Sequence, residues 1–310
     1  MRLISALLLC VISCMPSFGL DKTTEIYNVA GSDTLRLDFY RAATPEPAPV
    51  MIFAFGGGFK GGERDNSSYM PMFEYMTRNG VAVVSVDYRT LLKDIPAQEM
   101  MTPDKFKANL ISAIDAATTD FLKATGYVVS KSSEWNINPS QIFACGSSAG
   151  AITVLQAEYS LCNDKIYYAG LGLPDDFNYA GVISMAGAIC SDGAPRWATT
   201  PCPMLLFHGD ADSIVPFVSA TLGDFGLWGS HTISDILTEQ QQPHRFHCFN
   251  GASHEIAGTP MDENRGEILD FIRAACSTGL NRTTKTTEEI PGNTDYKKDF
   301  TIIDYIKANL

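Results

Sequence analysis

Short apolar runs alternate with longer segments of helical periodicity from about residue 25 to residue 276. Several runs, such as residues 50–55 and 81–86, contain almost no polar residue. Uninterrupted runs of this kind are typical of strands that are buried on both faces of a parallel sheet. The predicted strands, in chain order, are residues 25–29, 34–40, 50–55, 81–86, 141–145, 181–186, 204–207 and 245–249.

Helical segments lie between most of these strands. Residues 103–125 place Phe106, Leu110 and Ile114 on one face of a helix. Further helices are predicted at residues 70–78, 151–159 and 262–275, and one is predicted to start within residues 215–222. Because strands and helices alternate, the sequence predicts an α/β fold with a mostly parallel sheet and helices on both faces.

Two segments have no clear periodicity. Residues 162–179 are rich in Tyr, Gly and Asp, and a long loop of this kind is often a lid or a pocket wall. From residue 277 the chain becomes polar, so residues 279–310 are predicted to be a polar tail after one domain over residues 20–278. Within that tail, only residues 300–306 are apolar enough to dock as a short helix or strand.

The N-terminus has the features of a secretory signal. Arg2 supplies a positive charge, residues 3–13 are apolar, and residues 17–19 form a small-x-small cleavage site, so residues 1–19 are predicted to be removed. Alternatively, residues 11–14 form a bacterial lipobox in which Cys14 would carry a lipid. The first interpretation predicts a secreted or periplasmic protein, and the second a protein anchored to a bacterial membrane. No other stretch is long and apolar enough for a transmembrane segment.

Charge and cysteine content limit the partners and the compartment. The formal net charge of -12 leaves no basic stripe for phosphates, so no nucleic acid partner is expected. An oxidising compartment would allow disulfides, and Cys190 with Cys202 is the first candidate pair. Cys145 lies in a predicted strand and is expected to remain a buried thiol.

The segment between the strand at 141–145 and the helix at 151–159 is Gly146-Ser147-Ser148-Ala149-Gly150. We interpret it as a nucleophile elbow with Ser148 at its tip. Gly146 and Gly150 remove side chains that would collide at so sharp a bend. A serine exposed at a helix N-terminus, near a base, is the arrangement that nucleophilic catalysis requires. The alternative is a turn of small residues that only lets a helix pack closely on the sheet.

Two further motifs follow predicted strands. Residues 208–212 read His-Gly-Asp-Ala-Asp and residues 251–254 read Gly-Ala-Ser-His. Together with the elbow, they resemble the α/β-hydrolase family, in particular its secreted esterases and carboxylesterase-like members. The resemblance covers residues 25–276 and implies a central sheet of about eight strands.

The resemblance also implies a catalytic triad. Ser148 would be the nucleophile, His254 the base and Asp212 the acid, with Asp210 as the alternative acid. The family's oxyanion loop, often His-Gly-Gly-Gly, matches residues 55–58, where phenylalanine replaces the histidine. That change removes a side chain that braces the loop but no backbone donor. The implied oxyanion hole consists of the backbone N–H groups of Gly57, Gly58 and Ala149.

The other histidines are interpreted as structural. His208 is expected to hydrogen-bond within its turn, and His231 lies in a polar connection. His244 and His247 form a pair, but no third ligand for a metal lies nearby in the sequence, so neither a metal nor another cofactor is expected. The glycines of residues 56–58 lack the Gly-Lys-Ser or Gly-Lys-Thr of a phosphate loop.

The resemblance therefore implies a serine hydrolase that cleaves carboxylic esters through an acyl-enzyme. The expected substrate is a small-molecule ester or a carbohydrate ester, such as an acetyl or feruloyl ester on a plant polysaccharide. Two alternatives remain open. A prolyl-type serine peptidase has the same fold and triad, but carries a large extra domain for which this chain has no room. A catalytically silent hydrolase fold would act as a binding module.

Overall fold

The computed structural model describes residues 20–100, 102–164, 170–277, 279–290 and 300–309. The predicted signal or lipobox, with Cys14, lies outside the described residues. Within the described ranges, no helix has both the length and the apolar character to span a membrane.

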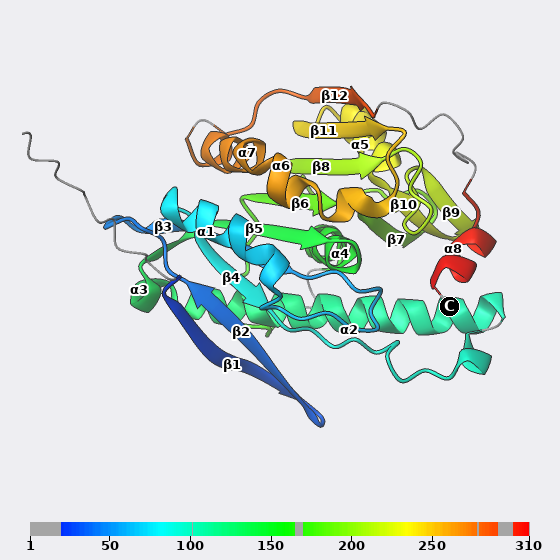
Figure 1. Cartoon of the computed structure of the whole chain (residues 1–310), viewed down its shortest axis with the longest axis horizontal. Helices are drawn as coiled ribbons and strands as arrows, with labels where there is room; N and C mark the ends of the chain where they lie inside the picture. Colours follow the sequence, from blue (N-terminus) through cyan, green and yellow to red (C-terminus); the bar gives the residue numbers. More distant parts are fainter. Residues whose placement is uncertain (1–19, 101, 165–169, 278, 291–299, 310) are drawn as a thin grey trace, which may run out of the picture.

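A sheet of nine strands forms the centre of the molecule (Figure 1). The strands are β1 (Lys22–Ala30), β2 (Asp33–Tyr40), β3 (Ala48–Ala54), β4 (Ala82–Val86), β5 (Ile137–Ser147), β6 (Gly181–Met185), β8 (Met204–Gly209), β11 (His244–Asn250) and β12 (Thr284–Glu289). Their spatial order is β1-β2-β4-β3-β5-β6-β8-β11-β12. The pairs β1–β2 and β2–β4 are antiparallel and the other neighbours are parallel. The prediction of a mostly parallel sheet is confirmed, but its size is corrected from about eight strands to nine in a mixed sheet.

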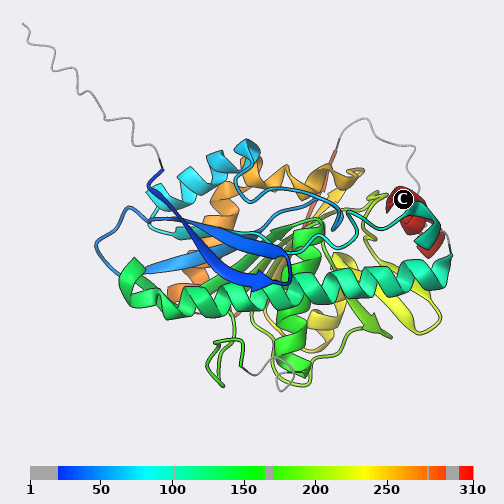
Figure 2. The same cartoon turned by 90° about the horizontal axis from the view of Figure 1, so that it is seen from below.

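Helices cover both faces of this sheet. The principal helices are α1 (Met70–Arg78), α2 (Pro103–Ser130), α4 (Ala149–Asn163), α5 (Ser230–Glu239) and α7 (Arg265–Ser277), with the short helices α3 (Ser132–Trp135) and α6 (Pro260–Glu263). On one face α1 contacts α7, and on the other α2 contacts α4 (Figures 1 and 2). The strands β4, β6 and β8 are therefore buried along their whole length, as their apolar sequences predict.

A second, three-stranded sheet corrects one sequence prediction. It consists of β7 (Ala188–Asp192), β10 (Phe225–Gly229) and β9 (Ser219–Leu222), in that order. The helix predicted to start within residues 215–222 is therefore wrong, and α5 starts only at Ser230. Gly223 adopts a φ of 60° in the β9–β10 turn, a conformation that favours a glycine turn over a continuing helix.

Of the connection predicted over residues 162–179, the described residues are not placed as predicted. The helix α4 begins directly after Ser148 and ends at Asn163 after 15 residues, so the connection that follows starts about 22 Å from Ser148. The connection leads into the N-terminal end of β6, and its Tyr179 hydroxyl hydrogen-bonds Thr125 of α2 at 2.9 Å. The described part of this segment, residues 170–179, thus lies at the edge of the sheet opposite the elbow, and the lid or pocket-wall interpretation is wrong for it.

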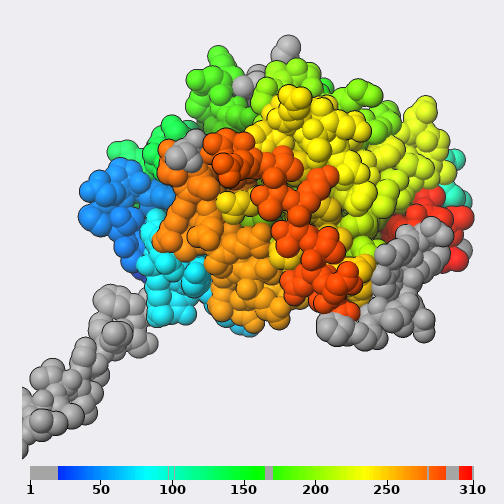
Figure 3. Space-filling model, turned by 90° about the horizontal axis from the view of Figure 1, so that it is seen from above, coloured from blue at the N-terminus to red at the C-terminus, as the bar shows by residue number. Residues whose placement is uncertain are grey.

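Two described elements of the predicted polar tail, β12 and α8 (Ile302–Asn309), pack on the domain. The strand β12 pairs in parallel with β11, and all of its residues are exposed on the outer face of the molecule (Figure 3). The helix α8 packs on α2 and β9, where Tyr305 contacts the ring of Phe106 edge-on. The expectation that residues 300–306 dock as a short helix or strand is confirmed for the helix. The boundary at residue 278 is corrected, because β12 belongs to the central sheet.

Cys190 and Cys202 do not form the predicted disulfide. Cys190 and Cys202 both carry unpaired thiols. The backbone N–H of Cys202 donates instead to the buried carboxyl of Glu158 at 2.7 Å. Cys145 is fully buried in β5 as predicted, and burial raises the pKa of its thiol.

Candidate active site

Ser148 lies at a sharp turn between β5 and α4. Its backbone has φ 52° and ψ −118°, a strained conformation for a residue other than glycine. A Cβ atom on Gly146 would lie 2.3 Å from the Gly150 carbonyl oxygen, and one on Gly150 would lie 2.1 Å from the Ala54 carbonyl oxygen. Both positions therefore require glycine, for the steric reason that the sequence predicts.

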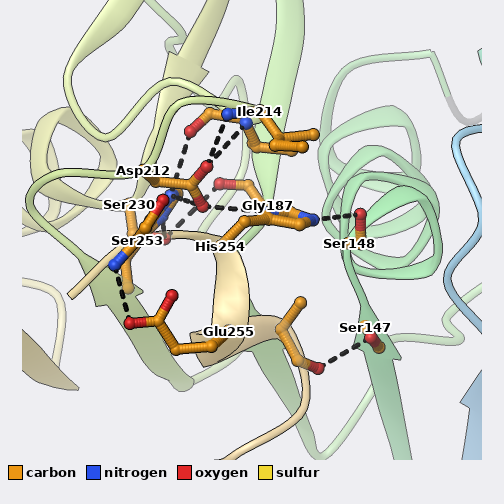
Figure 4. A network of polar contacts seen from close by, with 12 residues as sticks. Ser147, Ser148, Gly187, Asp212, Ile214, Ser230, Ser253, His254 and Glu255 are labelled. Carbon is orange, nitrogen blue, oxygen red and sulfur yellow. Dashed lines mark hydrogen bonds and ion pairs between the residues drawn. The ribbon is translucent and has the colours of Figure 1, made fainter. Parts of the chain in front are cut away.

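Hydrogen bonds hold this elbow on three sides. The N–H of Ser148 donates to the Met185 carbonyl of β6 at 2.9 Å, and its carbonyl accepts from the Ile152 N–H of α4 at 2.9 Å. The Ser147 hydroxyl donates to the carbonyl of Ala257 at 2.7 Å (Figure 4). That last bond connects the elbow to the short 3-10 helix His254–Ala257. Ser147 was not singled out from the sequence, where nothing distinguishes it from its neighbours.

Ser148, His254 and Asp212 form a continuous line of hydrogen bonds (Figure 4). The Ser148 Oγ atom lies 2.8 Å from His254 Nε2, and His254 Nδ1 lies 2.8 Å from Asp212 Oδ2. The Asp212 side chain is fully buried, whereas 21% of the His254 side chain is exposed. The three residues come from separate parts of the chain, after β5, β8 and β11, and meet at the C-terminal edge of the parallel strands.

The surroundings of Asp212 keep it ionised. Burial alone raises the pKa of this carboxyl, but the hydrogen bonds from His208 and His254 outweigh it and hold the pKa well below its usual range. The other oxygen, Oδ1, accepts from the backbone N–H groups of Ile214 and Val215 at 2.8 and 2.9 Å. Asp212 is therefore a charged and fixed acceptor for the histidine ring.

Asp210, the alternative acid, faces a different partner. Its Oδ1 atom accepts from the backbone N–H of Gly251 at 2.7 Å. Gly251 starts the turn that leads to His254, so Asp210 ties the β8 turn to the β11 turn. The geometry thus favours Asp212 over Asp210 as the residue that contacts the histidine.

His208 does more than hydrogen-bond within its turn. It is fully buried, and its Nε2 atom lies 3.3 Å from Asp212 Oδ2 and 3.3 Å from the Val215 carbonyl oxygen. Its Nδ1 atom lies 2.8 Å from the hydroxyl of Ser230, the first residue of α5. Asp212 is therefore contacted by two imidazole rings. The His-x-x-x-Asp spacing at the end of a buried strand was a signal in the sequence that could have suggested this contact.

The glycine loop after β3 runs beside the elbow. A Cβ atom on Gly56 would lie 3.2 Å from the Ser148 Cβ atom, which places this loop directly against the serine. Gly57, Gly58 and Phe59 follow with φ values of 138°, 61° and 57°. A Cβ atom on Gly57 would lie 2.2 Å from the Gly61 carbonyl oxygen, so the loop can close only with glycine at this position. Ala149 is the first residue of α4.

The remaining histidines bond elsewhere. His244 contacts the Ser234 hydroxyl and the Gln242 carbonyl, both at 2.9 Å. His247 lies between Glu267 of α7 and Glu288 of β12, and His231 lies 3.4 Å from a carboxylate oxygen of its own helix. Across the part of the chain that the structure describes, no three His, Cys, Asp or Glu side chains form a group that could hold a metal ion.

The elbow, the strand order and the triad geometry define an α/β-hydrolase fold, and its structural neighbours are bacterial esterases. Est2, an esterase from the planctomycete Thermogutta terrifontis, matches with a TM-score of 0.58 and 17% identity, over 83% of this chain and 92% of that one. The same enzyme phosphonylated by cyclosarin matches with a TM-score of 0.55 and 19% identity, over 81% and 91% of the two chains.

A truncated carbohydrate esterase from gut microbiota matches with a TM-score of 0.54 and 18% identity, over 82% of this chain and 96% of that one. No protein-family model and no curated protein sequence matches the chain. At these identities the likeness is one of fold, and the chemistry must be argued from the side chains of this chain.

Proposed function

We propose that this protein is a serine esterase that hydrolyses carboxylic esters through an acyl-enzyme. The observation that carries the proposal is the unbroken line of hydrogen bonds from Ser148 through His254 to Asp212. Nucleophile, base and acid are each within hydrogen-bonding distance of the next, which is the arrangement that activates a serine hydroxyl.

Each residue has a defined role in this proposal. Ser148 Oγ attacks the ester carbonyl carbon while His254 Nε2 accepts its proton. Asp212 accepts a hydrogen bond from the Nδ1–H group of His254 and stabilises the imidazolium that forms. The N–H groups of Gly57, Gly58 and Ala149 donate to the oxyanion of the tetrahedral intermediate. His254 then returns the proton to the leaving alcohol, and water, activated by the same base, releases the acid.

For the substrate, we propose a small-acyl ester or an ester linked to a carbohydrate. Support comes from the similarity of fold to a carbohydrate esterase from gut microbiota. The prolyl-type peptidase alternative lacks support, because the described residues form one hydrolase domain with only a three-stranded accessory sheet and no large gating domain. The binding-module alternative predicts that Ser148 is unreactive, although its hydroxyl lies 2.8 Å from a base.

We also propose that residues 1–19 direct export, to a secreted or periplasmic location or to a lipid anchor at Cys14. Mass spectrometry of the mature protein from its native host distinguishes these outcomes. An N-terminus at residue 20 supports signal cleavage, and a lipid-modified Cys14 at the N-terminus supports the anchor. Retention of residues 1–19 contradicts the proposal.

The activity test uses p-nitrophenyl esters of increasing acyl length, methyl ferulate, an acetylated xylan and a proline-containing peptide amide. We expect turnover of short-chain esters, with at least one polysaccharide or feruloyl ester cleaved, and no turnover of the amide. The variant His254→Ala should lose activity by about 10⁴-fold or more. The matched control His244→Ala replaces a buried histidine outside the site and should retain activity. Full activity of His254→Ala, or turnover of the amide alone, would contradict the proposal.

A further inference from the structure

The glycine loop beside Ser148 needs an external support. Gly57, Gly58 and Phe59 form three consecutive residues with positive φ, and such a run has no regular secondary structure to hold it. Phe55, at the start of the loop, has no polar side-chain atom with which to fix the loop itself. Within the loop, the N–H groups of Lys60 and Gly61 donate to the Gly57 carbonyl at 3.0 and 3.2 Å. These bonds close the turn but do not attach it to the domain, so contacts from other parts of the chain must do so.

Tyr88 supplies these contacts. It follows the C-terminal end of β4 and is only 3% exposed. Its hydroxyl donates to the carbonyl oxygen of Phe55 at 2.6 Å. Its ring stacks on the Phe55 ring with centroids 4.4 Å apart and meets the Phe59 ring edge-on at 6.3 Å. One buried side chain thus contacts both ends of the glycine run.

A neighbouring backbone group adds to the support. The backbone N–H of Leu92, four residues after Tyr88, donates to the Phe59 carbonyl at 2.9 Å. The carbonyls of Phe55 and Phe59, on either side of the glycines, therefore both accept hydrogen bonds from residues 88–92. The Tyr88 bond to the Phe55 carbonyl also fixes the plane of the Phe55–Gly56 peptide, one residue before the peptide that carries the Gly57 N–H.

We propose that Tyr88 is a positioning residue that fixes the oxyanion loop against Ser148, through its hydroxyl bond to the Phe55 carbonyl. This inference rests on the proposed function, because the loop needs to be held in one orientation only if its N–H groups stabilise a tetrahedral oxyanion. Burial raises the pKa of the Tyr88 hydroxyl, so the group remains a protonated donor throughout the working pH range of an esterase. Tyr88 does not contact the substrate in this account.

The test is Tyr88→Phe, which removes only the hydroxyl. Because the loop donors are displaced and not deleted, kcat should fall by about tenfold, less than the loss of an oxyanion-hole donor itself. KM for a short-chain p-nitrophenyl ester should change less than about twofold. A trifluoromethyl ketone, which forms a tetrahedral oxyanion adduct with the serine, should bind about tenfold more weakly. A smaller folded fraction would lower the apparent kcat but would change neither KM nor this inhibition constant, so weaker inhibition would not result from partial unfolding.

The matched control is Tyr179→Phe. Tyr179 is also buried and its hydroxyl is also hydrogen-bonded, to Thr125 at 2.9 Å, but at the opposite edge of the sheet. This variant should lose comparable thermal stability while kcat and inhibitor affinity stay at wild-type values. The proposal is overturned if Tyr88→Phe keeps wild-type inhibitor affinity, or if Tyr179→Phe weakens it equally. Loss of the proposed function is a separate outcome, recognised by wild-type protein without ester turnover.

Discussion

Two carboxylates that lie two positions apart after β8 contact different partners. Asp212 accepts from His254 and from two backbone N–H groups, whereas Asp210 accepts from the backbone of Gly251. A carboxylate orients an imidazole only where it can accept a hydrogen bond from the Nδ1–H group of the ring. The different hydrogen-bond partners therefore lead to different expectations for the same substitution at the two positions.

We expect Asp212→Asn to lower kcat by about 10⁴-fold, because an amide that donates to Nδ1 would stabilise the wrong tautomer of His254. Asp210→Asn should lower kcat by less than about tenfold, since it weakens the bond to the Gly251 backbone but leaves the hydrogen bond between Asp212 and His254 in place. Steady-state kinetics with one activated ester compare the two variants. The reverse order of effects would assign the acid role to Asp210.

His208 contributes to the site through Asp212. We expect His208→Asn to lower kcat by about tenfold, because the Asp212 carboxylate would lose one of its two imidazole contacts, and to cost about 1–3 kcal/mol of unfolding free energy. Kinetics and urea unfolding measure both effects. His244→Asn is the control, because His244 is equally buried and hydrogen-bonded but bonds outside the site. A stability loss in both variants with unchanged kcat in both would mean that His208 is only structural.

At the scale of single elements, two glycines within helices differ in how closely other atoms approach them. Their substitution by alanine therefore distinguishes the effect of close packing on stability from the effect of backbone entropy. Gly126 lies inside α2, where a Cβ atom would be 2.2 Å from the Leu171 carbonyl oxygen, whereas Gly266 in α7 has only the Tyr75 hydroxyl within reach, at 3.9 Å. Gly266→Ala should therefore stabilise the fold by about 0.5–1 kcal/mol. Gly126→Ala should destabilise it despite the better helix propensity of alanine. Thermal unfolding of both variants measures these changes in stability. Stabilisation of both variants would contradict the close approach of α2 to residue 171.

The strand β12 is connected to the domain by a titratable contact. His247 of β11 lies 3.1 Å from Glu267 of α7 and 3.3 Å from Glu288 of β12. The hydrogen bond to Glu267 and the charge of Glu288 raise the pKa of His247, although burial opposes them. A raised folded-state pKa means that this stabilisation is fully present below the ordinary histidine pKa of about 6.5 and is lost as the pH rises through the folded value.

We therefore expect His247→Asn to cost on the order of 1 kcal/mol more at pH 5.5 than at pH 9. Its loss of ring stacking on Phe249 acts at every pH and cancels in this difference. Urea unfolding of the wild type and the variant at the two pH values measures this difference in free energy. Glu267→Gln serves as the matched variant and should show a pH dependence of the same sign. A larger cost at pH 9 than at pH 5.5 would contradict the assigned contact.

The elements that could be predicted from the sequence are those with a hydrophobic signal. The buried strands β4, β6 and β8 and the helix α1 follow from apolar runs and helical spacing. The strand β12 could not be predicted in this way, because all of its residues are exposed and polar, and its place in the sheet comes from backbone pairing with β11 and from side-chain contacts such as that of Glu288 with His247. The hairpin of β9 and β10 was missed because the apolar residues of 215–222 fit a helix as well as a strand.

At the scale of the whole molecule, the triad residues predicted from the sequence motifs meet at the C-terminal edge of the parallel strands. Ser148, Asp212 and His254 could be located because each follows a strand in a short motif whose spacing is local. Tyr88 acts through a contact between separate segments, and no local pattern encodes a hydroxyl that reaches a carbonyl 33 positions away along the chain. His208, in contrast, contacts Asp212 only four positions further on. The support from Tyr88 therefore required the fold.

The central claim is that Ser148 is an activated nucleophile, and covalent labelling tests it most directly. The protein and its Ser148→Ala variant are each treated with a fluorophosphonate, and intact mass is measured beside a Ser147→Ala control. Ser147 lies next in the chain but bonds the Ala257 carbonyl instead of a base. We expect one adduct on the wild type and on Ser147→Ala, and none on Ser148→Ala. An unlabelled wild type, or an adduct that persists in Ser148→Ala, would contradict the account.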